Sequence, residues 1–310
     1  MTLPNVKPEH LTHLCGQLVS ARDPAVADPS KLVSKILRDL WDDVVLPVVQ
    51  YLTQLGVPKK SRIWWCPASE FFALPLHAAG TYHHQQRNLP DMYISSYVPT
   101  VSALINARSH MVREPIVPKL LCIGQPGDGV SNVHDEIDSV RQLGDFVNVM
   151  VGTDVNRETV LHGLQQHSWV HFACPSHLGD DNTQPLHASF ELALGSRLTL
   201  LDLIQTRLSN AELALLSSCH SSAGDPSSPD RTIHLAAALH FCGFRSVVGS
   251  LWAMEDGPMI SKGFYKYIFR KPENKADFRD SAESLDLAVR EMRGQGVPLE
   301  HWIRFVHIGA

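Results

Sequence analysis

The chain has 310 residues, of which 44% are hydrophobic and 19% are charged, as expected for a folded globular protein and not for a disordered or fibrous one. Its formal net charge is -5 at pH 7 and it contains no run of Lys or Arg, so we expect neither a general nucleic-acid binder nor a basic membrane-surface protein. We expect no signal peptide and no membrane span, because no stretch is long and apolar enough. The six scattered cysteines are typical of reduced thiols in the cytosol or nucleus, and we predict a cytoplasmic protein.

The first third of the chain has an irregular pattern. It predicts a long helix around residues 32–55, a strand over 62–66, a compact segment over 73–80, a strand near 93–99 and a helix capped by Thr100. The stretch from Arg113 to Pro118 contains two prolines and is the best candidate for a boundary. We therefore expect an N-terminal α/β half over residues 1–115 and a second half over residues 116–310.

The second half alternates regularly between apolar runs and helical patterns. The predicted strands cover residues 119–123, 146–151, 168–174, 212–218 and 245–252. The predicted helices cover residues 133–140, 199–208, 233–241, 258–268 and 282–293, and the tail 301–308 is expected to add an edge strand. Nearly continuous apolarity suits strands that are buried on both faces. The fold class is therefore α/β, with a mostly parallel sheet and helices on both of its faces.

Two of the predicted strands lead into polar loops that could carry chemistry. The strand over 168–174 is followed by Pro175, Ser176 and His177, and the strand over 212–218 is followed by Cys219 and His220. Catalytic groups collect at the carboxyl ends of parallel strands. A His on one such loop and a Cys on another suit a thiol nucleophile with a general base, and the 42-residue separation (219 − 177) is close to the spacing in caspases.

The sequence resembles the CHAT domain family, a caspase-like peptidase domain that is often attached to tetratricopeptide repeats. The resemblance is carried by Trp64–Pro67 with Leu74–Gly80, by Trp169–Cys174, by Ala211–Cys219 and by Gly243–Trp252. The sequences of these motifs are most similar to those of fungal members. The resemblance implies a caspase-like fold over most of the chain, with residues 116–310 as the peptidase-type half. It also implies Cys219 as the nucleophile, no cofactor, and a polypeptide substrate or protein partner.

One motif departs from the family pattern. The family continues the strand into Cys-His-Gly, and that His is the catalytic base, whereas this chain has Cys174, Pro175 and Ser176. Pro cannot accept a proton, so either His177 serves as a substitute base or the dyad is broken. The sequence therefore leaves two alternatives: a cysteine endopeptidase that uses Cys219 and His177, or an inactive CHAT module that binds proteins. The resemblance further implies regulation by repeat domains outside this chain.

The remaining candidates have plainer interpretations. We expect His171 and Cys174 to pack in the core, His77 to have a capping or packing role, and His220 to be a weaker alternative base. Glu255 or Asp256 could line a substrate pocket, but a helix cap is the simpler role.

The sequence predicts neither a zinc site nor a phosphate-binding loop. A zinc site would need Cys174, His177, Cys219 and His220 to converge, and their spacing is unusual for zinc, so no metal is predicted. Gly124, Gly127 and Gly129 follow a strand without the phosphate-binding arrangement, and they predict a turn.

Overall fold

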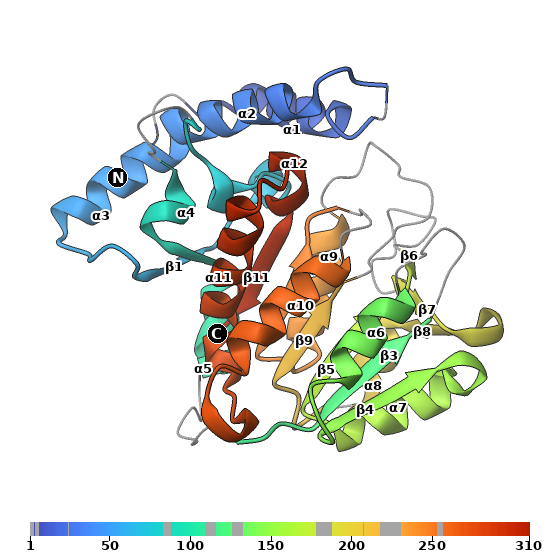
Figure 1. The fold of residues 1–310 in the computed structure, drawn as a ribbon. Helices are drawn as coiled ribbons and strands as arrows, with labels where there is room; N and C mark the ends of the chain where they lie inside the picture. Colours follow the sequence, from blue (N-terminus) through green and yellow to red (C-terminus); the bar gives the residue numbers. More distant parts are fainter. Residues whose placement is uncertain are drawn as a thin grey trace.

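An eight-stranded sheet runs through the whole molecule (Figure 1). The structure is a computed structural model that describes residues 3, 6–23, 25–82, 88–108, 116–125, 133–177, 188–206, 208–217, 231–252 and 257–310. In spatial order the strands are β1 (Arg62–Trp65), β2 (Ile94–Tyr97), β11 (Phe305–Gly309), β10 (Ser246–Ser250), β9 (Leu213–Leu216), β5 (Trp169–Ala173), β3 (Leu120–Gly124) and β4 (Val147–Val151). β10 and β11 pair antiparallel and the other neighbours pair in parallel, which confirms the predicted α/β class.

The helices divide between the two faces because right-handed crossovers require it. The chain moves outward from β3 to β4 through one helix and then returns towards β5, β9 and β10 through others, which places them on the opposite face. The first face carries α6 (Val133–Arg141), α10 (Gly257–Ile268) and α11 (Ser281–Gly294), which pack together in front of the sheet in Figure 1. The second face carries α7 (Arg157–Gln166), α8 (Leu200–Thr206) and α9 (Arg231–Phe241).

Local signals account for several helix ends. Thr199 and Asp202 form the expected reciprocal cap of α8: each backbone N–H donates to the side chain of the other, at 2.9 and 3.2 Å. Gly243 follows α9 with a φ of 117°, and a Cβ there would lie 2.8 Å from the Leu208 carbonyl oxygen. Only glycine satisfies both conditions.

Two strands differ from expectation in their position. β11 is not an edge strand, because β1 and β2 of the N-terminal half continue the sheet beyond it. The edges are instead β1 and β4, and the residues of β4 are half-buried or exposed although its sequence is nearly all apolar. The apolarity of a strand does not by itself predict whether it pairs with one neighbouring strand or with two.

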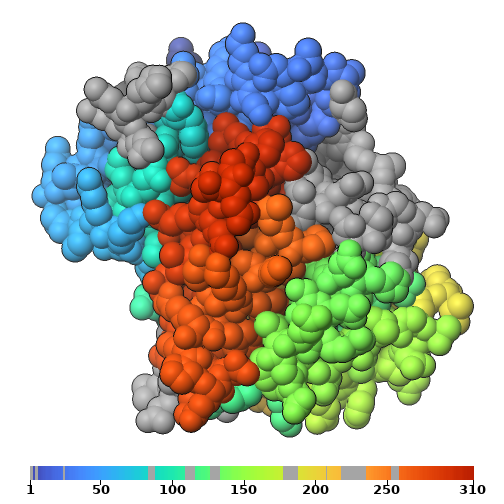
Figure 2. Space-filling model, viewed as in Figure 1, coloured from blue at the N-terminus to red at the C-terminus, as the bar shows by residue number. Residues whose placement is uncertain are grey.

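The N-terminal helices, blue in Figure 2, lie at the top of the view against the red C-terminal segment. They are α1 (Pro8–Ser20), α2 (Pro29–Leu40), a π-helical turn (Trp41–Val45) and α3 (Leu46–Gln54). The last three run on without a break, as the predicted long helix over 32–55 requires. α2 packs against α12 (Leu299–Trp302), and the Ser30 hydroxyl donates to Glu300 at 2.5 Å.

Shorter elements complete the structure. They are α4 (Leu89–Met92), α5 (Val101–Arg108), the strands β6 (Ser176–His177), β7 (Ser189–Glu191) and β8 (Arg197–Thr199), and the 3-10 turns Ser69–Phe72, Leu76–Ala78, Gly152–Asp154, Ala193–Gly195, Pro272–Asn274 and Phe278–Asp280. β6, β7 and β8 form a separate antiparallel sheet.

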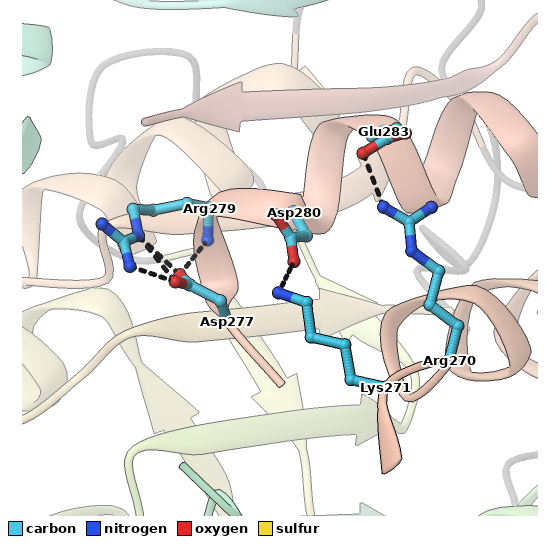
Figure 3. A network of polar contacts seen from close by, with 6 residues as sticks. All are labelled: Arg270, Lys271, Asp277, Arg279, Asp280 and Glu283. Carbon is cyan, nitrogen blue, oxygen red and sulfur yellow. Dashed lines mark hydrogen bonds and ion pairs between the residues drawn. The ribbon is translucent and has the colours of Figure 1, made fainter. Parts of the chain in front are cut away.

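Ion pairs hold the connection between α10 and α11 (Figure 3). They join Arg270 to Glu283, Lys271 to Asp280, and Arg279 to Asp277. Each pair is partly exposed and contributes at most about 1 kcal/mol to the free energy of unfolding. The backbone N–H of Ala276 in the same connection donates to the Ile116 carbonyl at 3.0 Å. The segment that leads into β3 is thereby attached to this connection.

A buried polar cluster joins β1, β2, β10 and α11 at β11, and we call it the junction cluster: His307, Arg62, Ser96, Ser246 and Ser281. Arg62 Nη2 donates to His307 Nδ1 at 3.1 Å, so Nε2 carries the ring proton. Nε2 lies 2.8 and 2.9 Å from the hydroxyls of Ser246 and Ser281. Burial and then the charge of Arg62 hold the pKa of His307 well below its ordinary value, so the imidazole is neutral.

Candidate active site

The carboxyl ends of β5 and β9 lie side by side at the end of the sheet that we call the site end. The two strands pair in parallel with Trp169 opposite Leu213 and Phe172 opposite Leu216, and both are fully buried. The backbone N–H of Ser217 donates to the Phe172 carbonyl at 3.3 Å, so the pairing continues to the last residue described after β9. The two predicted chemistry-bearing loops therefore leave from neighbouring strands.

The segment after β5 is held in place by its backbone. The N–H of Gln125 donates to the Ala173 carbonyl at 3.1 Å, and that of Glu191 donates to the Pro175 carbonyl at 2.8 Å. Ser176 and His177 then pair with Phe190 and Ser189 as strand β6. Pro175 is thus buried directly before β6.

Stacked aromatic rings attach this small sheet to the large one. Phe190 of β7 lies parallel to Phe172 of β5, with ring centroids 4.1 Å apart. Such a contact contributes about 1 kcal/mol beyond the burial of the two rings. The backbone of His177 is therefore positioned relative to β5 through β7.

Several sequence-predicted residues lie outside the described part of the chain. These are Cys219, His220, Glu255, Asp256, Gly127 and Gly129. The dyad of His177 and Cys219 accordingly stays a prediction. Within the described residues no three His, Cys, Asp or Glu side chains gather as metal ligands would.

A buried polar cluster lies beneath the site end, and we call it the sub-site cluster: His171, Glu136 and Ser217. His171 Nε2 is 2.8 Å from Ser217 Oγ and 3.2 Å from Glu136 Oε1. The contact with Glu136 is within ion-pair distance but is not a hydrogen bond, because neither Glu136 oxygen has a hydrogen-bond partner among the described residues. Burial raises the pKa of Glu136, but contacts with His171, Ser261 and Ser217 outweigh it and lower the pKa below its ordinary value. The Glu136 carboxylate is therefore held in the core beside Ser217. Ser217 precedes Cys219 by two residues in the sequence.

Sequence reasoning identified His171 as an interior residue but missed Glu136. The signal was present, because Glu136 lies three residues after Val133 and four before Val140 on the apolar face of α6. A charged residue on such a stripe indicates a buried partner.

The two other predicted packing residues are also buried. Cys174 is 1% exposed and lies directly after β5. The Tyr97 hydroxyl lies 2.9 Å from His77 Nδ1 and accepts from the His77 backbone N–H at 3.1 Å. Burial lowers the pKa of His77 to about 4. His77 therefore packs as a neutral side chain in the N-terminal half.

Comparison with known proteins identifies the family. The CHAT domain family matches residues 34–310, so the chain belongs to the CHAT family. No curated protein matches the sequence. Among solved structures, separase in the Saccharomyces cerevisiae separase–securin complex is similar in fold, with a TM-score of 0.55 and 13% identity.

That similarity is extensive in this chain and limited in the other. It covers 97% of this chain and 20% of the separase chain. At this level of identity it shows the fold alone, which is caspase-like. In the described part of the chain, no helix has the length and apolarity that crossing a bilayer requires.

Proposed function

We propose that this CHAT domain has the function of a caspase-like cysteine endopeptidase, with Cys219 as the nucleophile and His177 as the base. The observation that supports it best is the pairing of β5 with β9, because the loops bearing His177 and Cys219 follow these two strands at one end of the sheet. The ordered backbone of β6 supports it further, since a base must be held within reach of its thiol.

In the proposed reaction His177 takes the proton of the Cys219 thiol. The thiolate then attacks the carbonyl carbon of a peptide bond, and His177 returns the proton to the leaving amine. The backbone N–H groups of Cys219 and of residues 176 and 177 are the proposed donors to the oxyanion, and Pro175 is excluded because it has no N–H. Water hydrolyses the acyl-enzyme. No cofactor takes part in the proposed steps.

A second candidate function is an inactive CHAT module that binds proteins. It is favoured by Pro175, whose ring cannot accept a proton and whose carbonyl is committed to Glu191. Successive strand residues are about 3.3 Å apart, so His177 lies about 7 Å further along the backbone than the family's base. If that displacement keeps His177 away from the thiol, only binding remains.

Labelling of the native protein with an iodoacetamide probe between about pH 5 and 9 distinguishes the two functions. The proposal expects rapid labelling of Cys219 at pH 6 and its loss in His177→Ala, with Cys219→Ala to identify the site. Exposed Cys66 is an internal reference for the extent of labelling. If Cys219 labels only near an ordinary thiol pKa of about 8.5 and His177→Ala changes nothing, the dyad is inactive.

Restoring the family motif provides the converse test. The double substitution Pro175→His with Ser176→Gly should create thiol reactivity in an inactive protein, and it should add little to an active one. The division at residues 115 and 116, the cytoplasmic location, regulation by repeat domains and the similarity to fungal members remain predictions from the sequence.

A further inference from the structure

A groove lies at the opposite end of the sheet from the site end, and we call it the distal groove. It has a volume of about 460 Å³ and is enclosed by α5, the end of α9 and the segments that lead into β9 and β10. Those segments contribute Leu208, Ser209, Phe244 and Arg245. Because β5, β9 and β10 are parallel, the groove is at their amino ends, and a ligand there leaves the site end open.

The charge of the distal groove is opposite to that of the chain. Arg245 is its one arginine, and no Asp or Glu is among the described residues that line it. The Arg245 guanidinium lies over the Phe278 ring at 5.8 Å, and it forms no ion pair with a described residue. The chain as a whole has a net charge of -5. A cation that has no counter-ion among the described residues of an anionic protein is suited to an anionic ligand.

A buried histidine forms part of the wall. His240 is 8% exposed, and its Nδ1–H donates to the Phe244 carbonyl at 2.7 Å. Burial lowers the pKa of His240, although backbone contacts with Phe244 and Ala103 oppose the shift. Because Nε2 is buried as well, His240 shapes the wall and a ligand in the groove would contact other residues.

The groove also offers an apolar anchor point. Phe241 ends α9 at the rim and is 65% exposed, although a residue of this type is usually buried. Leu208 and Phe244 lie in the same wall and are buried. An apolar side chain of a ligand could cover Phe241 and remove it from water.

We propose that the distal groove binds an acidic, partly apolar polypeptide segment of another protein. A carboxylate of the segment pairs with Arg245, and a neighbouring apolar side chain packs on Phe241. A second copy of the chain fits poorly, because a twofold contact through this groove would place Arg245 near its own symmetry mate. The proposal is independent of whether Cys219 is reactive.

Selection from a random-peptide library displayed on phage tests this proposal. The library is selected on the full chain and counter-selected on the double variant Phe241→Ser, Arg245→Glu. The expected survivors carry Asp or Glu next to a large apolar residue. One survivor is synthesised with a fluorescent label, and its dissociation constant is measured by anisotropy.

Single variants then assign the contacts. Arg245→Glu and Phe241→Ser should each weaken binding about tenfold or more. The matched control is Leu194→Ser, which changes an apolar residue that is 90% exposed outside the groove and should alter binding less than about twofold. A peptide in which Lys replaces the acidic residues should bind the Arg245→Glu variant more tightly than it binds the native protein. Thermal melting of each variant checks that it is folded, and Arg245→Gln replaces Arg245→Glu if the latter is not.

Three results would overturn the proposal. The first is that no peptide survives counter-selection, and the second is that the survivors are not acidic. The third is a dimer, seen by light scattering, that Phe241→Ser dissociates, since the groove would then be an interface between copies.

Discussion

The sub-site cluster and the junction cluster both place a histidine in the core, yet the two are opposite in charge. His171 lies against the carboxylate of Glu136, whereas His307 receives a hydrogen bond from the guanidinium of Arg62. The first histidine holds an anion in the core, and the second must be neutral to accept from a cation. A buried histidine therefore says little by itself, because the partner brought by another element decides its role.

The largest expected effect is at the sub-site cluster. Glu136→Ala leaves His171 without its anion and should lower the free energy of unfolding by about 4 kcal/mol. Urea unfolding at pH 7 measures the loss, with Glu136→Gln as the milder variant that keeps the shape. A loss below about 1 kcal/mol would show that the pair contributes no more than a surface ion pair.

The same carboxylate predicts an acid-side signature. The pKa of Glu136 is depressed in the folded protein, so its contribution is present above the unfolded value of about 4.3 and is lost as the pH falls through the folded value. Glu136→Gln should therefore flatten the stability profile below about pH 4 and leave the profile above it unchanged in slope. Flattening near neutral pH would contradict this assignment.

The junction cluster should respond in a different pH range. His307→Leu removes one partner from Arg62 and from the buried hydroxyls of Ser96, Ser246 and Ser281, and we expect a loss of about 3 kcal/mol at pH 7. Because the pKa of His307 is depressed, the unfolded chain takes up the proton first, and stability falls as the pH drops below about 6.5. The variant should reduce that slope by about 1.4 kcal/mol per pH unit. His77→Phe should reduce the slope in the same range, because burial also lowers the pKa of His77 to about 4, but it removes no contact of the junction cluster.

The smallest effect concerns a single hydroxyl. Ser217→Ala removes the 2.8 Å contact with His171 and should cost about 1 kcal/mol. Ser284 is a matched control, because its hydroxyl is buried without a hydrogen-bond partner among the described residues, and Ser284→Ala should be neutral or slightly stabilising. Equal effects in the two variants would show that the Ser217 contact contributes nothing specific.

Much of the second half could be predicted because its signals are local. Apolar runs identified β3, β5, β9 and β10, and the Thr199–Asp202 cap and Gly243 marked helix ends. Elements without such signals were missed, including α1, α7 and the small sheet of β6, β7 and β8. Strands of two or three residues are too short to show a period. Their stability comes from contacts such as the Phe172–Phe190 stack.

The sequence by itself determined the fold class, the family and the two loops at which chemistry is expected. Apolar periodicity and sequence motifs depend only on residues that are close together in the chain, so they can be recognised without the tertiary structure. Only the tertiary structure decided that β11 is interior, that Glu136 meets His171, and that the amino ends of β9 and β10 form a groove. These features join residues that are far apart in the chain. Such contacts form only when the strands have paired into the sheet and the helices have packed on its two faces.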